Sequence, residues 1–243
     1  MVDLPDELEL SDPQTRVLGC LLEKQATTPD AYPLTLKALT TACNQTSSRD
    51  PVVDYDANLV ETTCQALKAK GLLRIVHPAS GERATKYRQI LDEQLGLDAA
   101  EKAIIAVLLL RGAQTVPELR SRTERLHAFA GQEEVESVLV ALAARTDRPL
   151  VRLLERAAGQ REARWMQLLQ HDADGRAEAA ATATTASSGA PGRAAASPGR
   201  VDELEARVEA LEGRLSQLVA ALDGLVELPD PVQQGADPSP ATD

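Results

Sequence analysis

Residues 54–90 have the sequence DYDANLVETTCQALKAKGLLRIVHPASGERATKYRQI, in which a helical pattern is followed by two short runs of strand character. Across residues 54–70, apolar side chains recur at the three- and four-residue spacing of one helix face. The side chains expected on that face are Leu59, Val60, Cys64 and Leu67. Gly71 follows a basic last turn, where a left-handed residue commonly ends a helix. Residues 72–76 and 85–90 then predict two strands around the turn HPASGER.

Two more helices are predicted upstream of this stretch. Residues 12–25 place apolar side chains on one stripe, with Ser11 or Asp12 as the cap, and residues 34–44 form a second, shorter pattern. Three helices followed by a hairpin is the order of a winged helix-turn-helix domain, which we therefore predict for residues 11–92. Its core is expected to rest on Leu18, Leu21, Leu22, Leu39, Val60 and Leu67.

The same order of elements recurs downstream, in residues 98–170. Helices are expected at 98–111, 116–122 and 132–145, and strands at 150–154 and 164–168. Weak internal similarity supports a duplication, because Arg74 matches Arg152 and Gln89 matches Gln167 at one offset of 78 residues. The predicted fold class is mainly α with small β-hairpin wings (α+β), built from two tandem winged helix-turn-helix domains.

The ends of the chain and its linker differ in composition from the two repeats. Residues 1–10 are acidic, residues 171–200 are rich in Ala, Gly, Ser and Pro, and residues 229–243 contain several prolines and acidic residues. We predict an acidic N-terminal tail, a disordered linker and a disordered C-terminal tail for these segments.

Residues 201–228 carry a heptad repeat, which predicts a coiled-coil helix. The expected dimer interface is formed by Val201, Leu204, Val208, Leu211, Leu215, Leu218, Leu222 and Leu225. A parallel pair matches Arg207 with Glu212 of the other chain, whereas an antiparallel pair would oppose like charges. The prediction is a parallel homodimer, and the alternative is a lone helix that folds back on the domains of its own chain.

Composition excludes several classes of function. The formal net charge is -11, but the negative charge lies in the tails and the two repeats are nearly neutral. Aromatic residues make up 2% of the chain, which is too few for a platform that stacks single-stranded nucleic acid. The three cysteines form no CxxC pair and have no adjacent histidine, so they are expected to be small buried side chains. We expect a non-enzymatic protein with no metal and no cofactor.

The sequence also bears on location. No apolar run approaches the ~18 residues of a membrane-spanning helix, and the acidic N-terminus lacks the pattern of a signal peptide. A cytoplasmic protein without membrane contact is therefore expected.

Several strings agree, in order, with one bacterial family. They are LLEKQATTPDAYPL (21–34), ACNQTSSRDPV (42–52), LLLRGAQTVPELRSRTER (108–125), EEVESVLVALA (133–143), REARWMQLL (161–169) and ARVEALEGRL (206–215). On these motifs the chain resembles the YceH-like proteins. The resemblance implies a tandem winged-helix fold. It implies no reaction, because the family has no established biochemical activity.

Double-stranded DNA is the leading candidate ligand, because the third helix of a winged-helix domain enters the major groove while the wing touches the backbone. Amide side chains on that helix suit base edges, and cations in the loops and wings suit phosphates. The candidate contacts are Arg49, Asn58, Thr62, Gln65, Lys68, Arg83, Lys86 and Arg88 in the first domain and Arg152, Arg156 and Arg161 in the second. The predicted function is DNA binding or transcription regulation as a dimer. The alternative is a protein-interaction adaptor that uses its winged helices as docking modules, without DNA contact.

Overall fold

A computed structural model describes residues 8–77, 84–156 and 160–170 of the 243-residue chain. The predicted linker, coiled coil and C-terminal tail lie outside the described residues, as do residues 1–7 of the predicted N-terminal tail. For residues 8–10 the prediction of a tail is wrong, because Leu8 and Leu10 are buried and the amide of Leu10 donates to the carbonyl of Leu169 at 2.8 Å. Among the helices of the described part, none has the length and apolar character needed to cross a membrane.

The first repeat contains three α-helices and a three-stranded antiparallel sheet in order β1-β3-β2. Its elements are α1 (Asp12–Thr27), the 3-10 turn η1 (Pro29–Ala31), β1 (Leu34–Thr35), α2 (Leu36–Cys43), α3 (Ala57–Ala69), β2 (Leu73–Val76) and β3 (Lys86–Gln89). The strand β1 was not predicted from the sequence, because two residues are too few to show an alternating pattern. It pairs with β3 through Leu34 opposite Tyr87.

Both ends of α3 are fixed by local hydrogen bonds. The side chain of Asp56 accepts a hydrogen bond from the backbone of Leu59 at 2.7 Å, so the helix starts at Ala57 rather than at Asp54. At the other end Gly71 has φ of 72°, and the amide of Leu72 donates to the carbonyl of Leu67 at 3.0 Å. The prediction of a left-handed glycine after this helix is confirmed.

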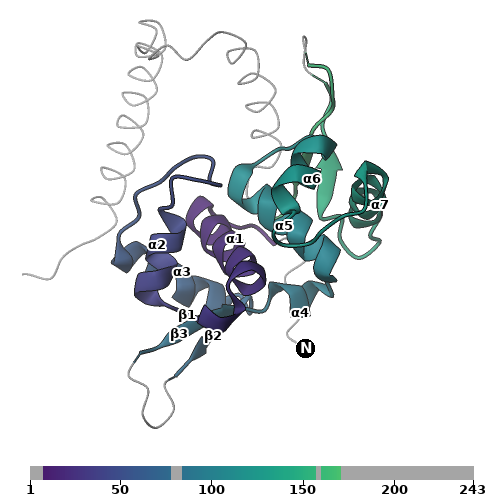
Figure 1. The fold of residues 1–243 in the computed structure, drawn as a ribbon. Helices are drawn as coiled ribbons and strands as arrows, with labels where there is room; N and C mark the ends of the chain where they lie inside the picture. Colours follow the sequence, from purple (N-terminus) through teal and green to yellow (C-terminus); the bar gives the residue numbers. More distant parts are fainter. Residues whose placement is uncertain (1–7, 78–83, 157–159, 171–243) are drawn as a thin grey trace, which may run out of the picture. The chain divides into compact units, whose positions relative to one another are not determined.

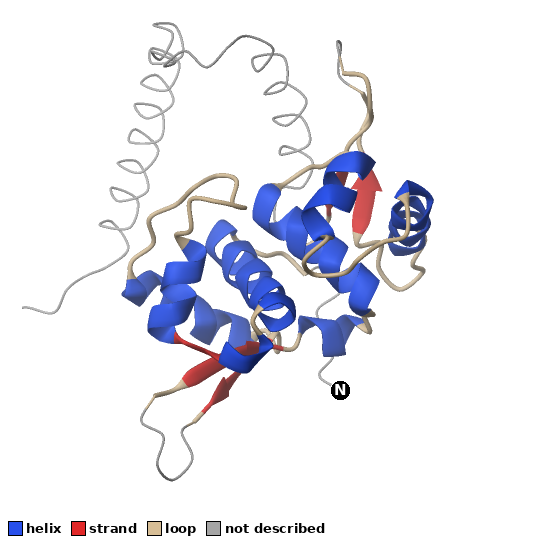
Figure 2. Ribbon diagram, in the orientation of Figure 1, coloured by secondary structure: helices blue, strands red, loops and turns tan. Residues whose placement is uncertain are grey.

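The second repeat follows after a short helix, α4 (Leu91–Leu95), where the sequence predicted only a connection. Its elements are α5 (Ala99–Arg111), α6 (Val116–Thr123), α7 (Gln132–Ala143), β4 (Val151–Leu153) and β5 (Trp165–Gln167). Figure 2 shows the two groups of strands apart from each other, one beside α1 to α3 and one among α5 to α7.

The strand registers of the two repeats correspond residue by residue. Leu73 lies opposite Gln89 in the first repeat, and Val151 lies opposite Gln167 in the second, which is the same pair shifted by 78 residues. An isolated bridge from Gln114 to Trp165 stands where β1 pairs with β3. The matches between Arg74 and Arg152 and between Gln89 and Gln167 are therefore confirmed as equivalent ladder positions.

The two repeats are joined through their first helices, as the side-by-side position of α1 and α5 in Figure 1 shows. Gly19 lies at this contact. A Cβ atom there would stand 2.8 Å from Cγ of Leu110 and 3.1 Å from Cβ of Leu109, closer than side chains pack. Glycine therefore permits the close approach of the two helices, and one continuous apolar core extends through both repeats.

The structure confirms an α+β protein with helices and small antiparallel sheets. All six predicted core side chains are buried. One predicted inward residue is wrong, because Leu59 is 39% exposed while Val60, Cys64 and Leu67 are buried. The buried side chains of α3 thus follow the spacing of Val60, and Leu59 falls just outside that stripe.

Candidate functional site

A groove of about 560 Å³ opens between α2, α3 and the β2–β3 hairpin, and we call it the first groove. Its lining residues are Thr35, Leu36, Lys37, Glu61, Gln65, Lys68, Ile75, His77, Ala84, Thr85 and Tyr87. The apolar floor includes Ile75 and Tyr87, which lie directly opposite each other on β2 and β3. The rim is polar and comes from two helices and the hairpin.

The exposed side of α3 carries the predicted base-contacting residues. Asn58, Thr62 and Gln65 are all exposed, and so is Lys68 one turn beyond Gln65. Because residues three and four apart share a helix face, Glu61, Gln65 and Lys68 stand in one row along the first groove. The structure therefore brings these candidates together on one surface.

The cations around the first groove differ in how exposed they are and in whether an ion pair already engages them. Lys37 and Lys68 are exposed and line the groove. Lys86 is half-buried on β3. Arg88 forms an ion pair with Glu93, which also lies 3.6 Å from Arg74. Arg83 lies outside the described residues.

Arg49, predicted to contact phosphate, is buried and faces inward. Its guanidinium forms two hydrogen bonds with the carboxylate of Glu23, at 2.6 and 3.0 Å, and Nε donates to the carbonyl of Ala42 at 3.0 Å. Burial by itself raises the pKa of Glu23, but hydrogen bonds and the charge of Arg49 outweigh that effect and lower the pKa overall. Arg49 holds the loop before α3 against α1, so the phosphate role predicted for it is wrong.

The arginines of the second repeat fall into two groups. Arg145 is paired with Asp147, while Arg164 binds Glu118 at 3.0 Å. Of the predicted contacts, Arg156 and Arg161 are exposed on the β4–β5 hairpin and Arg152 is half-buried on β4. The exposed pair is separated in sequence from α7, whose first turn is acidic through Glu133 and Glu134. Helix and hairpin of this repeat therefore differ in charge.

The three cysteines lie in the interior of the first repeat and differ in their pKa shifts. Cys20, Cys43 and Cys64 are all buried and free, as predicted. Burial by itself raises the pKa of Cys20, but a hydrogen bond with Cys43 and the charge of Arg49 lower it overall. Burial raises the pKa of Cys64 to about 12, so its thiol stays protonated near neutral pH. Within the part of the chain that the structure describes, no three His, Cys, Asp or Glu side chains gather as a metal site would require.

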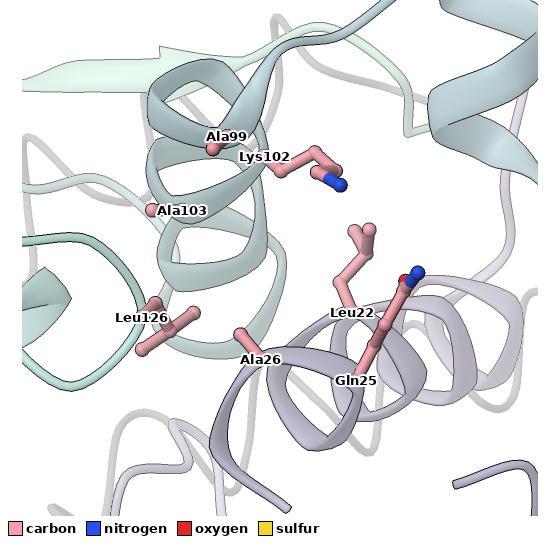
Figure 3. Close-up of a pocket in the computed structure, with 7 residues that line it drawn as sticks. All are labelled: Leu22, Gln25, Ala26, Ala99, Lys102, Ala103 and Leu126. Atoms are coloured by element: carbon pink, nitrogen blue, oxygen red, sulfur yellow. The ribbon is translucent and has the colours of Figure 1, made fainter. Parts of the chain in front are cut away.

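A smaller cavity of about 280 Å³ lies between α1 and α5. Figure 3 shows that α1 contributes Leu22, Gln25 and Ala26, that α5 contributes Ala99, Lys102 and Ala103, and that Leu126 is the remaining lining residue. Its one cation, Lys102, is paired with Asp92 at 3.1 Å, and Gln25 accepts a hydrogen bond from Gln89. Both polar side chains are thus engaged by the protein itself, and the cavity is part of the packing between the repeats.

Sequence reasoning did not find the ion pair of Glu23 with Arg49 or the network around Gln89. The backbone amide of Gln89 donates to the hydroxyl of Tyr32 at 2.8 Å, and the side chain of Gln89 reaches Gln25 and Asp92. The signal that was available is that Gln89 recurs as Gln167 in the other repeat. Both glutamines are buried, which is unusual for this residue type and indicates a structural role.

Comparison with known proteins places the chain in a family. The family model described as "Protein of unknown function, DUF480" matches residues 10–160. A UPF0502 protein of Pelobacter propionicus is 49% identical over 172 residues, which cover 71% of this chain and 77% of the relative. The UPF0502 protein YceH of Salmonella paratyphi B is 46% identical over 170 residues, covering 68% and 79%. The chain therefore belongs to the DUF480, or UPF0502, family of bacterial proteins, in agreement with its resemblance to the YceH-like proteins.

Proposed function

We propose that this chain is a non-enzymatic, tandem winged-helix protein that binds double-stranded DNA and regulates transcription as a dimer in the cytoplasm. The observation that carries the proposal is the row of polar side chains on the exposed face of α3, next to the β2–β3 hairpin. In a winged-helix domain, the third helix lies in the major groove and the hairpin lies beside the backbone. The matching strand registers of the two repeats support the same domain type for both.

The side chains of α3 have the chemistry that base edges need. Asn58 and Gln65 each offer one donor and one acceptor, which suits adenine in the major groove, and Thr62 suits either a base edge or a thymine methyl group. Lys37 and Lys68 at the rim of the first groove then provide the phosphate contacts that set orientation.

Acidic residues limit the affinity of a single domain. Asp54, Asp56 and Glu61 are exposed near the start of α3, where phosphates would approach. Modest affinity per domain is compatible with useful binding if two copies are linked, because the second contact then benefits from a high effective concentration. The heptad repeat at 201–228 supplies that link in the proposal.

Fluorescence anisotropy with labelled duplex DNA tests the proposal. We expect full-length protein to bind a random-sequence duplex with an affinity that falls steeply between about 50 and 200 mM salt. Lys37→Ala and Lys68→Ala should weaken binding to all sequences, while Asn58→Ala and Gln65→Ala should mainly reduce discrimination between sequences. Arg120→Ala removes an equal charge from an exposed position of the second repeat and is the matched control.

Two outcomes would overturn the DNA proposal. Absence of duplex binding at low salt would leave the adaptor function, in which both repeats dock proteins. Binding that Arg120→Ala weakens as much as Lys68→Ala does would move the site away from α3.

The dimer is tested separately by sedimentation of the full chain. Wild-type protein should sediment as a dimer at micromolar concentration, and Leu211→Asp in the heptad seam should yield monomers, because a carboxylate in the seam loses its hydration. Equal masses for both proteins would contradict the coiled-coil dimer. Reversal of one interfacial charge, as in Arg207→Glu, should weaken a parallel pair, whereas it should not weaken an antiparallel pair, in which Arg207 would face another arginine.

A further inference from the structure

The second repeat has its own groove, of about 420 Å³, between α6, α7 and the β4–β5 hairpin. We call it the second groove. Its apolar lining includes Val116, Val140, Leu153 and Trp165. Leu153 and Trp165 lie directly opposite each other on β4 and β5, so both side chains point to the same face of the hairpin.

The second groove occupies the same place in its repeat as the first groove does. Leu153 and Trp165 correspond to Ile75 and Tyr87 at the offset of 78 residues. The burial of α7 repeats that of α3, since Val135, Leu139 and Leu142 take the places of Val60, Cys64 and Leu67. By that alignment Val140 stands where the first groove has Gln65.

Part of the polar rim of the first groove is apolar in the second, although Glu136 and Glu162 keep charged groups there. Lys37 corresponds to Pro117, because α2 and α6 start 80 residues apart, and Thr85 corresponds to Ala163 on the hairpin. Three polar side chains of the first groove thus have apolar counterparts at one location of the second. A surface that gains apolar residues together, rather than singly, is typical of an interaction site.

The apolar residues of the second groove are open to solvent. Val140 is 57% exposed and Leu153 is 50% exposed, and both line this groove. They belong to the small group of large apolar side chains that remain exposed within residues 8–77, 84–156 and 160–170. Covering them would remove apolar surface from water, which favours association.

The charge of the second groove is negative. Its charged lining residues are Glu136 on α7 and Glu162 on the hairpin, and α7 carries Glu133 and Glu134 in its first turn. Among the described residues, no ion pair engages Glu136 or Glu162. Glu136 corresponds to Glu61 of the first groove, but the described lining of the second groove contains no counterpart of Lys37 or Lys68. Two carboxylates without those lysines repel phosphates, so the second groove is less suited to DNA than the first. They also disfavour the C-terminal 201–243 segment of the same chain, which has ten acidic and two basic residues.

We propose that the second groove docks a short segment of another protein, which inserts an apolar side chain between Val140 and Trp165 and places a Lys or Arg next to Glu136 and Glu162. The apolar floor contributes most of the affinity, and the two carboxylates select a basic segment over an acidic one. The volume falls within the ~300–1,000 Å³ of ordinary ligand pockets, so one or two side chains fill the groove. This site is separate from the DNA-binding surface on α3.

Trp165 provides a direct readout, because it is the single tryptophan of the chain and it lines the second groove. We would select a phage-displayed library of random short peptides on the full-length protein and synthesise the enriched peptides that lack tryptophan. Each is then titrated while the emission of Trp165 is recorded. The enriched peptides should combine a large apolar residue with Lys or Arg, and their binding should shift the emission to shorter wavelength.

Matched variants locate the binding site. Val140→Asn with Leu153→Thr keeps helix and strand propensity and should weaken the peptides by about tenfold or more, because the anchor then meets polar groups. Val52→Asn with Val76→Thr changes two exposed valines outside the second groove (55% and 38% exposed) and should leave binding unchanged. Glu136→Gln and Glu162→Gln should each weaken the basic peptides by roughly threefold, as exposed ion pairs do.

Three results would each overturn the proposal. They are a selection that enriches no peptide over background, enriched peptides that are predominantly acidic, and enriched peptides whose affinity survives the Val140 and Leu153 changes. Thermal unfolding of each variant, followed by circular dichroism, verifies that it is folded, so lost binding is not mistaken for lost structure.

Discussion

The first and second grooves lie at the same place in two equivalent repeats, yet Lys37, Gln65 and Thr85 of the first have apolar counterparts in the second. The strand ladders, the burial pattern of the third helices and the threonine caps at Thr35 and Thr115 are shared. The differences are confined to side chains that face the opening, such as Gln65 against Val140. A duplicated scaffold therefore fixes where a groove forms, while a few exposed positions set the polarity of its lining.

The repeats also differ in how deeply their ion pairs between arginine and glutamate are buried. The first buries Arg49 against Glu23, whereas the second keeps Arg164 and its partner Glu118 a quarter or more exposed. A buried pair is costly to break because the remaining charge has no solvent, while an exposed pair is hydrated after its partner is lost. The first repeat should therefore be the more sensitive of the two to charge changes.

The largest expected effect follows from that contrast. Glu23→Gln should lower the free energy of unfolding by about 3 kcal/mol, the lower end of the range for breaking a buried ion pair, because the amide keeps part of the hydrogen bonding. Glu118→Gln is the matched change in the second repeat and should cost at most about 1 kcal/mol. Urea denaturation measures both, and equal losses would show that the two pairs are equally hydrated.

A smaller effect tests whether the repeats share one core. Gly19→Ala should lower the free energy of unfolding by about 1–2 kcal/mol, because overpacking costs ~1–3 kcal/mol and the helix propensity of alanine returns up to ~1. Gly131→Ser adds a side chain where nothing lies within 4 Å and should be neutral or stabilising. Calorimetry should show one transition for the wild type, and two separate transitions would refute a shared core.

If DNA binds at the first groove, removing one lysine there should cost little binding free energy. The change should nevertheless be visible in the salt dependence of the affinity. Lys68→Ala should reduce the slope of log affinity against log salt by ~0.9, the value for one phosphate contact on duplex DNA. Val140→Asn in the second groove should leave that slope unchanged. If both variants behave alike, the two grooves do not differ in function as proposed.

The smallest effect concerns pH. Because Arg49 lowers the pKa of Glu23 below its ordinary value of ~4.3, the stabilisation is fully present above that pH and is lost as pH falls through the folded-state pKa. Wild-type protein should therefore lose stability between neutral and acidic pH more steeply than Glu23→Gln. Parallel curves for the two proteins would indicate that Glu23 titrates normally.

Much of the architecture could be predicted from the sequence because its signals are local. The signals for helices involve only a few neighbouring residues, as in the apolar stripe from Val17 to Leu22 and the glycine after Lys70. The internal duplication also presents the same order of elements twice. The prediction that Leu59 points inward was wrong because this residue lies at the edge of the apolar stripe, where a side chain can face solvent. The two-residue β1 depends on pairing with a strand some fifty residues away, which periodicity does not report.

The functional surfaces were only partly predictable, for a physical reason. Asn58, Thr62, Gln65 and Lys68 could be placed on the outer face of a helix from spacing alone, and that placement is confirmed. The inward position of Arg49 could not be predicted in this way. It depends on the carboxylate of Glu23, which lies 26 residues earlier in the sequence. The second groove was missed because helix spacing leaves Val140 outside the inward stripe but does not show that Leu153 and Trp165 of the hairpin line the same groove.

The absence of a side chain at Gly19 bears on how the two repeats can move relative to each other. Because α1 and α5 touch at Gly19, the repeats cannot pivot about a hinge in the way that domains joined only by a linker do. We therefore expect their two surfaces to keep one relative orientation. A DNA duplex on α3 and a peptide in the second groove would then be held at a fixed angle. Gly19 contributes to that geometry together with the apolar side chains of the core that the two repeats share.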